Sequence, residues 1–434
     1  PVAGCEFRAR ELATTAHGAA KSGASAGELM AALARGAERR VGDCNAQEMA
    51  NLAYAFAKAQ HEAPELLDAI AEHARPRLGE FKAQELSNLA WAYATAKRAA
   101  PALLDAIAEQ ARPRLREFNE QALSNTLWAY ASAKHEAPAL FDAIAEQTIA
   151  RPSELTPQAL STIAWACASA KHCPAQLLDA IAKEARPRLR EFSAQQLSNS
   201  VWAFAKADHA DPELYAALAA AVARRLGDFN PQDLASTAMA FAKACHVDAQ
   251  LFASLARAAE TRADESNLQD LVSTAWAFAK VGQFDTGLYA ALSRSLIGRR
   301  LDELDAPHIA NVAWAFSKAT QTPDVALFAA LARTATHRVG DFGAQDLATI
   351  AWSFANADQL ETRLFAALAK SAERLLDKFS AEDRDNAEWA FVRAGQQRIV
   401  KLLRQQKARG ACGPTSLARA PDVDVGKCGR IVVA

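Results

Sequence analysis

The stretch FNEQALSNTLWAYASAK, residues 118–134, carries the pattern that decides the fold of this 434-residue chain. A version of it returns every 37 or 38 residues, and one position in it holds all eight tryptophans: Trp91, Trp128, Trp165, Trp202, Trp276, Trp314, Trp352 and Trp389. His17, Tyr54 and Met239 fill that position in the other copies, so eleven copies cover about residues 8–407. A period of this length predicts a stacked array of similar units.

Each copy predicts two helices. The first one follows Asn, Ser, Thr or Asp in most copies, and these are preferred helix N-cap residues. Within residues 84–93, Leu86, Leu89 and Tyr93 fall on one face at helical spacing. The second helix opens near a proline such as Pro64 and closes at an Ala-Arg-Pro-Arg-Leu sequence, as at residues 74–78. Proline ends or kinks a helix there because it lacks a backbone N–H.

We therefore expect an all-α fold, a right-handed α-solenoid of about eleven helical hairpins of 37–38 residues. The solenoid is expected to span residues 8–407, with the first helices on one surface and the second helices on the other. Residues 408–434 contain Gly and Pro without a helical period and are expected to form a flexible C-terminal tail. No run of 18 apolar residues is present, so no membrane span is expected.

A polar position recurs on the first helix, opposite its apolar face. Four residues after the recurrent glutamine, every copy has Asn, Ser or Thr, although these residues compete with the helix backbone for hydrogen bonds. We call this position the polar slot, and its candidate RNA-binding members are Asn51, Asn88, Asn125, Thr162, Asn199, Ser236, Ser273, Asn311 and Thr349. Two explanations stay open. Each slot side chain reads one exposed base of a single RNA strand, or each bonds to the next repeat in an internal ladder.

Two further positions complete the stripe on the first helix. The tryptophans either stack on bases or fill the gap between neighbouring first helices, and we favour packing. Cations close the helix and are the candidate contacts to the RNA backbone: Lys58, Lys206, Lys243, Lys280 and Lys318. In three copies the lysine comes two residues later, at Lys97, Lys134 and Lys171. Cations also stabilise a helix C-terminus by themselves, so their presence is compatible with a purely structural role.

Net charge and composition limit the classes of function that this chain can have. The formal net charge is −1, whereas a nucleic-acid-binding domain is more often clearly basic. Acidic residues such as Glu65 and Asp68 fall on the second helix, so a neutral total is compatible with a basic edge. The sequence contains no nucleophile–base set, no phosphate loop and no CxxC pair, and its recurring histidines lie in successive repeats, about 10 Å apart. We expect neither an enzyme nor a metal or cofactor site.

The motif FNxQxLSNxxWAxAxAK resembles the 37–38-residue repeats called octotricopeptide and heptatricopeptide repeats. It is also similar to the helical regions of FAST-kinase-like proteins and RNA-editing substrate-binding complex proteins. The resemblance covers about residues 8–407 and places the family's variable polar position at the polar slot. It implies sequence-selective binding of single-stranded RNA in the matrix of a mitochondrion or the stroma of a chloroplast, in RNA processing, editing, stability or translation. The alternative is a protein-interaction scaffold within an organellar ribonucleoprotein or ribosome. Neither a small-molecule substrate nor a membrane partner is expected.

Overall fold

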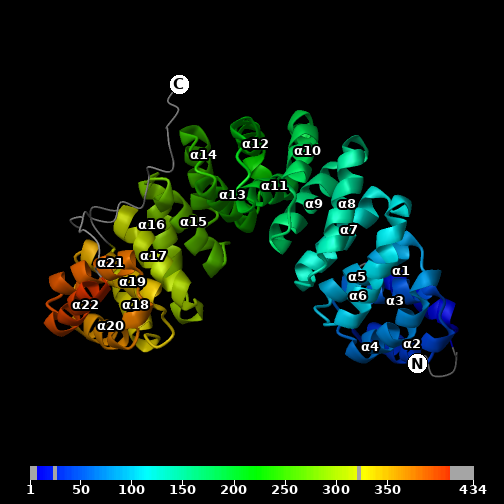
Figure 1. Cartoon of the computed structure of the whole chain (residues 1–434), viewed down its shortest axis with the longest axis horizontal. Coiled ribbons are helices and arrows are strands. Elements are labelled where there is room, and N and C mark those ends of the chain that lie inside the picture. Colours follow the sequence, from blue (N-terminus) through cyan, green and yellow to red (C-terminus); the bar gives the residue numbers. More distant parts are fainter. Residues whose placement is uncertain (1–6, 23–26, 320–323, 411–434) are drawn as a thin grey trace. The chain divides into compact units, whose positions relative to one another are not determined.

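The computed structural model describes residues 7–22, 27–319 and 324–410, and over these residues it is all-α, without a strand. These ranges contain twenty-two α-helices, which pair in chain order into eleven hairpins (Figure 1). The predicted fold class is confirmed. Two compact units divide the chain between Leu218 and Ala219, inside α12 (Pro212–Arg225), and each is described by itself.

The unit that ends at Leu218 contains two layers of helices. The layer of first helices consists of α1 (Ala9–Ser22), α3 (Ala46–Lys58), α5 (Ala83–Thr95), α7 (Glu120–Ala133), α9 (Pro157–Ala170) and α11 (Ala194–Lys206). The layer of second helices consists of α2 (Gly27–Glu38), α4 (Pro64–Ala74), α6 (Pro101–Ala111), α8 (Pro138–Ala150), α10 (Ala175–Ala185) and the start of α12. Successive first helices pack directly against one another, as expected for a solenoid.

The unit that begins at Ala219 repeats this arrangement. Its first helices are α13 (Pro231–Lys243), α15 (Leu268–Lys280), α17 (Ala306–Ala319), α19 (Ala344–Asn356) and α21 (Ala381–Arg393). Its second helices are α14 (Ala249–Thr261), α16 (Thr286–Ile297), α18 (Val325–His337), α20 (Thr362–Arg374) and α22 (Gln397–Gly410). Here too each first helix packs on the next one in the chain.

The first helices begin where the capping residues predict. The Asn119 side chain accepts a hydrogen bond from the backbone N–H of Ala122 at 2.8 Å. At the start of α3, Asn45 and Glu48 form a reciprocal capping box, with both bonds at 2.9 Å. Lys82 stands at the corresponding position before α5 and its side chain makes no capping bond. These bonds satisfy backbone N–H groups that the helix leaves without a partner.

Removing a cap gives a direct test of this account. Asn119→Ala is expected to lower the free energy of unfolding by about 1 kcal/mol, because the N–H of Ala122 loses its acceptor. Lys82→Ala is the matched control, since it changes a cap position that makes no side-chain bond. Urea unfolding of both variants checks the prediction, and an equal loss in both would contradict it.

Small side chains allow the close packing of the first helices. Ser87 and Ser124 are buried between them, together with alanines such as Ala90 and Ala129. Some of the second helices are spaced by short 3-10 segments instead: η2 (Arg75–Glu80), η3 (Arg112–Glu117) and η5 (Arg186–Glu191). Each of these segments starts at the predicted Arg-Pro-Arg sequence. The proline therefore ends α4, α6 and α10 as expected.

In several repeats, an arginine side chain forms a hydrogen bond to the preceding repeat. The Arg114 guanidinium donates to the backbone carbonyl of Phe81 at 3.0 Å and is held by Glu117, also at 3.0 Å. Corresponding bonds to the preceding repeat join Arg77 to Cys44, Arg188 to Leu155, Arg262 to Phe229 and Arg338 to Leu304. These bonds were not predicted from the sequence. The recurrence of an arginine shortly before the N-cap of the next repeat was the available signal.

The first helices end in a left-handed residue. In three repeats this residue is the lysine that comes two residues later than in the other copies. The backbone angle φ is 50° at Lys97, 52° at Lys134 and 55° at Lys171. The N–H of the following residue bonds back into the helix, as from His135 to the carbonyl of Tyr130 at 3.0 Å. This is the Schellman type of helix end.

The predicted tail begins inside the last helix. α22 continues to Gly410, three residues into the predicted 408–434 segment, and the remainder of that segment lies outside the described residues. Of the helices that the structure describes, none combines the length and apolar character needed to cross a membrane.

Candidate nucleic-acid interface

The polar slot lies on the accessible side of the first helices. All nine of its singled-out side chains are half-buried. Across the described residues, none of them forms a hydrogen bond to a neighbouring repeat. Asn88 accepts a bond from Gln84 Nε2 at 3.0 Å, but both belong to α5. The internal ladder considered from the sequence is therefore not formed, and the mid-helix Asn, Ser and Thr residues need another explanation.

Grooves between successive first helices bring slot residues next to the recurrent glutamines. A groove of about 360 Å³ between α7 and α9 is lined by Gln121, Asn125 and Gln158, among others. In the other unit, a groove of about 540 Å³ is lined by Asn311, Gln345 and Thr349. Each groove combines amide or hydroxyl donors and acceptors with carboxylates, Glu120 and Glu191 in the first groove and Asp346 and Asp383 in the second. Such side chains are suited to the edges of unpaired bases.

Rings at the aromatic position, which we call the aromatic row, contact one another between several pairs of neighbouring repeats. Ring centroids lie 6.2 Å apart for Trp91 and Trp128, and 6.1 Å apart for Trp165 and Trp202, with the planes tilted by 31° in both pairs. Most rings are half-buried, but Trp352 is only 4% exposed. The favoured packing interpretation agrees with these contacts, because each ring fills space between two first helices. Ring edges remain at the surface in the other repeats.

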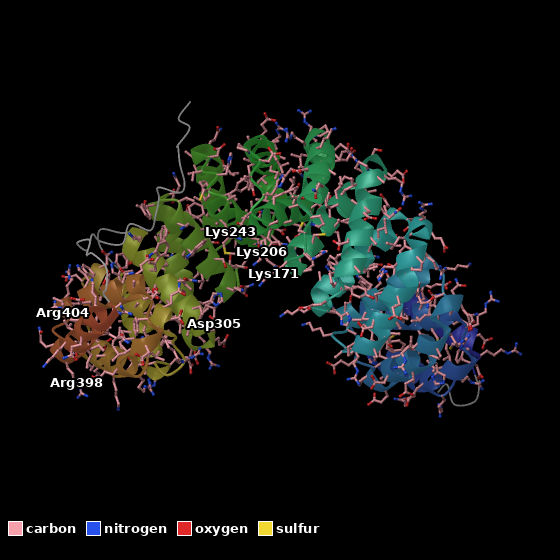
Figure 2. The ribbon with its side chains drawn as sticks, in the orientation of Figure 1. Lys171, Lys206, Lys243, Asp305, Arg398 and Arg404 are labelled. Atoms are coloured by element: carbon pink, nitrogen blue, oxygen red, sulfur yellow. The ribbon has the colours of Figure 1, made fainter. Side chains whose placement is uncertain are left out.

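The lysines lie beside this row at the C-terminal ends of the first helices. Lys58, Lys206 and Lys243 are exposed, and Lys280 and Lys318 are half-exposed. The ammonium group of Lys58 lies 5.8 Å from the centroid of Tyr54, that of Lys206 lies 6.0 Å from Trp202, and that of Lys318 lies 5.0 Å from Trp352. Figure 2 labels Lys206 at the end of α11 and Lys171 at the end of α9. Contact with the ring faces holds several ammonium groups along the aromatic row.

Acidic residues gather at the opposite ends of the first helices. Glu48, Glu85 and Asp346 follow the N-cap by three residues, as do Asp233 and Asp270. The slot lies between the two ends, seven residues or about 10 Å from the lysine position. We call the row of these N-terminal carboxylates the acidic edge, and the row of C-terminal lysines the lysine edge. A polyanion would be repelled by the acidic edge and attracted by the lysine edge, so a phosphate backbone is expected on the lysine side of the stripe.

Burial affects the acidic edge. It raises the pKa of the Asp270 carboxyl, the nearby Asp233 carboxylate raises it further, and a backbone hydrogen bond from Asn267 opposes the shift. The charged form is thus disfavoured in the folded state. The charged carboxylate therefore lowers the free energy of unfolding at neutral pH. This effect disappears once the pH falls below the unfolded-state pKa of about 3.9.

Asp270→Asn is accordingly expected to raise the free energy of unfolding at pH 8, with a gain that shrinks as the pH falls towards 4. Urea unfolding across this pH range measures it. Glu265→Gln removes an exposed acid from the preceding turn and serves as the control. A gain that grows on acidification would reverse the assigned sign.

The recurring histidines join neighbouring repeats. His135 Nε2 lies 2.7 Å from Asp105 Oδ1, and His172 Nε2 lies 2.7 Å from Asp142 Oδ1. The acidic partner comes from the second helix of the preceding repeat, so each of these side-chain hydrogen bonds joins two hairpins. Among the residues that the structure describes, no three His, Cys, Asp or Glu side chains are grouped to hold a metal ion.

Comparison with known proteins connects the chain with one family. The family model described as RNA-editing substrate-binding complex 6 protein matches residues 3–221 and 174–318. No curated protein matches the chain. A chain of the structure titled "Homology model of the full-length AP-3 complex in an intermediate open conformation" aligns with 86% of this chain and 75% of its own length. Its identity is 11% and its TM-score 0.29, too low to support any argument. The family match, in contrast, extends over most of the sequence, and the chain belongs to the RNA-editing substrate-binding complex 6 protein family.

Proposed function

We propose that this protein binds single-stranded RNA selectively through the stripe of its first helices and acts within an RNA-editing complex of an organelle. The observation that carries the proposal is the polar slot. Its half-buried side chains form no hydrogen bonds between the described repeats and in part line grooves between successive first helices. The description of the family supports the connection with RNA editing. In this role the chain is a binding protein and not an enzyme, and it uses no metal or cofactor.

The proposed mode places one base at each repeat, as in octotricopeptide-type recognition. The base edge meets the slot side chain, for example Asn125, and the recurrent glutamines Gln121 and Gln158 that line the same groove. The partly exposed tryptophan edges border the base, while the phosphate lies towards the lysine end of the helix. An Asn side chain both donates and accepts hydrogen bonds, whereas Ser and Thr offer a single hydroxyl. Exchange among these residues would change the preferred base at one position.

Selection from a random single-stranded RNA pool tests the proposal. Binding is expected at low salt and should fall as salt rises, with a log–log slope near −0.7 for each phosphate contact. Recovery of an enriched sequence would support selective recognition. The competing function is a protein scaffold, which the near-neutral charge favours. Failure to retain any RNA at low salt would replace the proposal with that alternative.

A single substitution separates base reading from stability. Asn125→Ser is expected to shift the preference at one nucleotide position while changing overall affinity by no more than about 1–3 kcal/mol. The melting temperature should stay near that of the unmodified protein, because Asn125 forms no hydrogen bond to a neighbouring repeat. Comparison of selected sequences and thermal unfolding for the two proteins makes the measurement. Equal weakening for all RNAs, together with a lower melting temperature, would assign the slot a structural role.

A further inference from the structure

A pocket outside the polar slot lies at the C-terminal ends of α7 and α9. Its volume is about 320 Å³, and it is lined by Tyr130, Lys134 and His135 from one repeat and by Phe141, Ser169 and His172 around them. Lys171 also reaches the lining. The volume is close to the lower bound of roughly 300 Å³ for sites that enclose small molecules.

The walls of this pocket are aromatic and fixed by packing. Phe141 is buried and meets the His172 ring edge-to-face, with centroids 6.2 Å apart. Tyr130 is buried as well and meets His135 in the same manner at 5.7 Å. Hydrogen bonds of both histidines to aspartates of the preceding repeats hold the rings in place. The pocket is therefore formed before any ligand enters.

The neighbouring repeats offer a contrast at one position. Leu104 and Leu178 occupy the place of Phe141 in the two adjacent repeats, whereas later repeats have an aromatic residue there, as at Tyr215, Phe252, Tyr289, Phe328 and Phe365. Phe141 is itself only 2% exposed, so it acts from beneath by supporting the His172 ring that faces the pocket. Aromatic rings at the pocket surface favour planar heterocycles, since ring faces and edges attract one another beyond the effect of buried area.

The rim of the pocket is cationic. Lys134 and Lys171 are exposed and sit in the left-handed turn that ends each helix, which fixes the backbone that carries them. Within the described residues, neither ammonium group is paired with a carboxylate. Glu136 also lines the pocket, so the two lysines outnumber the carboxylate among its lining residues. The Ser169 hydroxyl has no hydrogen-bond partner in the described structure and supplies a further polar group.

We propose that this pocket binds one nucleotide. Its heterocycle would lie against the two histidine rings that Phe141 and Tyr130 support, and its phosphate would be held by Lys134 and Lys171. A phosphate alone would leave the aromatic walls unused, and an apolar ligand would leave both ammonium groups unused. The nucleotide is either free or one residue of an RNA strand. The second case deepens the proposed function, and the first is independent of it.

Titration of the full-length protein with uridine 5′-monophosphate tests the pocket. Calorimetry is expected to show saturable binding that is tighter than binding of uridine or of inorganic phosphate alone. The double variant Lys134→Gln/Lys171→Gln should weaken it at least about tenfold, the effect expected when a charge-assisted contact is lost. Gln60 has the same left-handed turn at the end of α3, so glutamine is compatible with this backbone. Lys97→Gln changes the corresponding lysine outside the pocket and should have no effect.

Phe141→Leu tests the aromatic wall with a residue that neighbouring repeats already accommodate. It should weaken nucleotide binding while leaving phosphate binding unchanged. Equal affinity for phosphate and nucleotide, or insensitivity to both variants, would overturn the proposal.

Competition with a single-stranded oligoribonucleotide separates the two sources of the nucleotide. If RNA displaces the monophosphate and the pocket variants weaken RNA binding, a nucleotide of the strand occupies the pocket. If the monophosphate binds but RNA does not, the pocket takes a free nucleotide and the proposed function fails alone. If RNA binds but the monophosphate does not, and the variants leave RNA binding unchanged, this inference fails alone.

Discussion

Replacing the five first-helix lysines together with glutamine is expected to weaken binding of single-stranded RNA about 3,000-fold at roughly 0.1 M salt. These lysines are Lys58, Lys206, Lys243, Lys280 and Lys318. The reason is release of counterions from the strand. With a slope near −0.7 per phosphate contact, each contact contributes about fivefold at this salt concentration relative to 1 M, and five contacts multiply. Fluorescence anisotropy with a labelled oligonucleotide measures the loss. Across a salt series, the variant's slope should be shallower by about 3.5.

The chain provides a control of equal charge. Lys183, Arg257, Arg294, Arg333 and Lys370 are exposed cations on the second helices, spaced by the repeat. Their replacement by glutamine removes the same five charges from the other helix layer. If the phosphates follow the lysine edge of the first helices, this variant should retain most of its affinity. Equal losses would show that RNA responds only to total charge, and a larger loss in the control would move the RNA backbone to the second helices.

Local patterns in the sequence were sufficient to predict the helices. Capping by Asn119 and termination before Pro113 depend on residues within one turn, and both are confirmed. The face of the polar slot also follows from helical periodicity alone. Contacts between repeats were harder to predict, because they depend on how far one hairpin is rotated relative to the next. Neither the bond from His135 to Asp105 nor the pocket around Phe141 can be read from a single repeat.

The aromatic row is a second feature whose contacts between repeats could not be predicted from the sequence. Its spacing placed the rings on one surface, but the sequence could not decide between packing and stacking on bases. That choice depends on the separation of neighbouring first helices, which small residues such as Ser87 and Ser124 set. The close approach brings Trp91 and Trp128 into contact and covers part of each ring. A wider separation would have exposed the ring faces.

Arg114→Ala is expected to lower the free energy of unfolding by about 2 kcal/mol, the usual effect of losing a hydrogen bond to a charged group. Arg114 is half-buried, and its removal leaves the carbonyl of Phe81 without this donor between two repeats. Arg112→Ala is the control, because Arg112 is an exposed arginine of the same 3-10 segment. Urea unfolding measures both variants.

Because Arg114 joins two repeats, its loss should also combine predictably with other losses and act locally. In a stacked array, stability is approximately a sum of repeat terms and interface terms between neighbours. Arg114 and Arg188 join different pairs of repeats, so their losses should add in the double variant Arg114→Ala/Arg188→Ala. Loss of the interface should also speed amide hydrogen exchange around Phe81, while exchange in α1 stays unchanged. An effect on exchange that is uniform along the chain would mean that Arg114 acts on general stability and does not join these two hairpins.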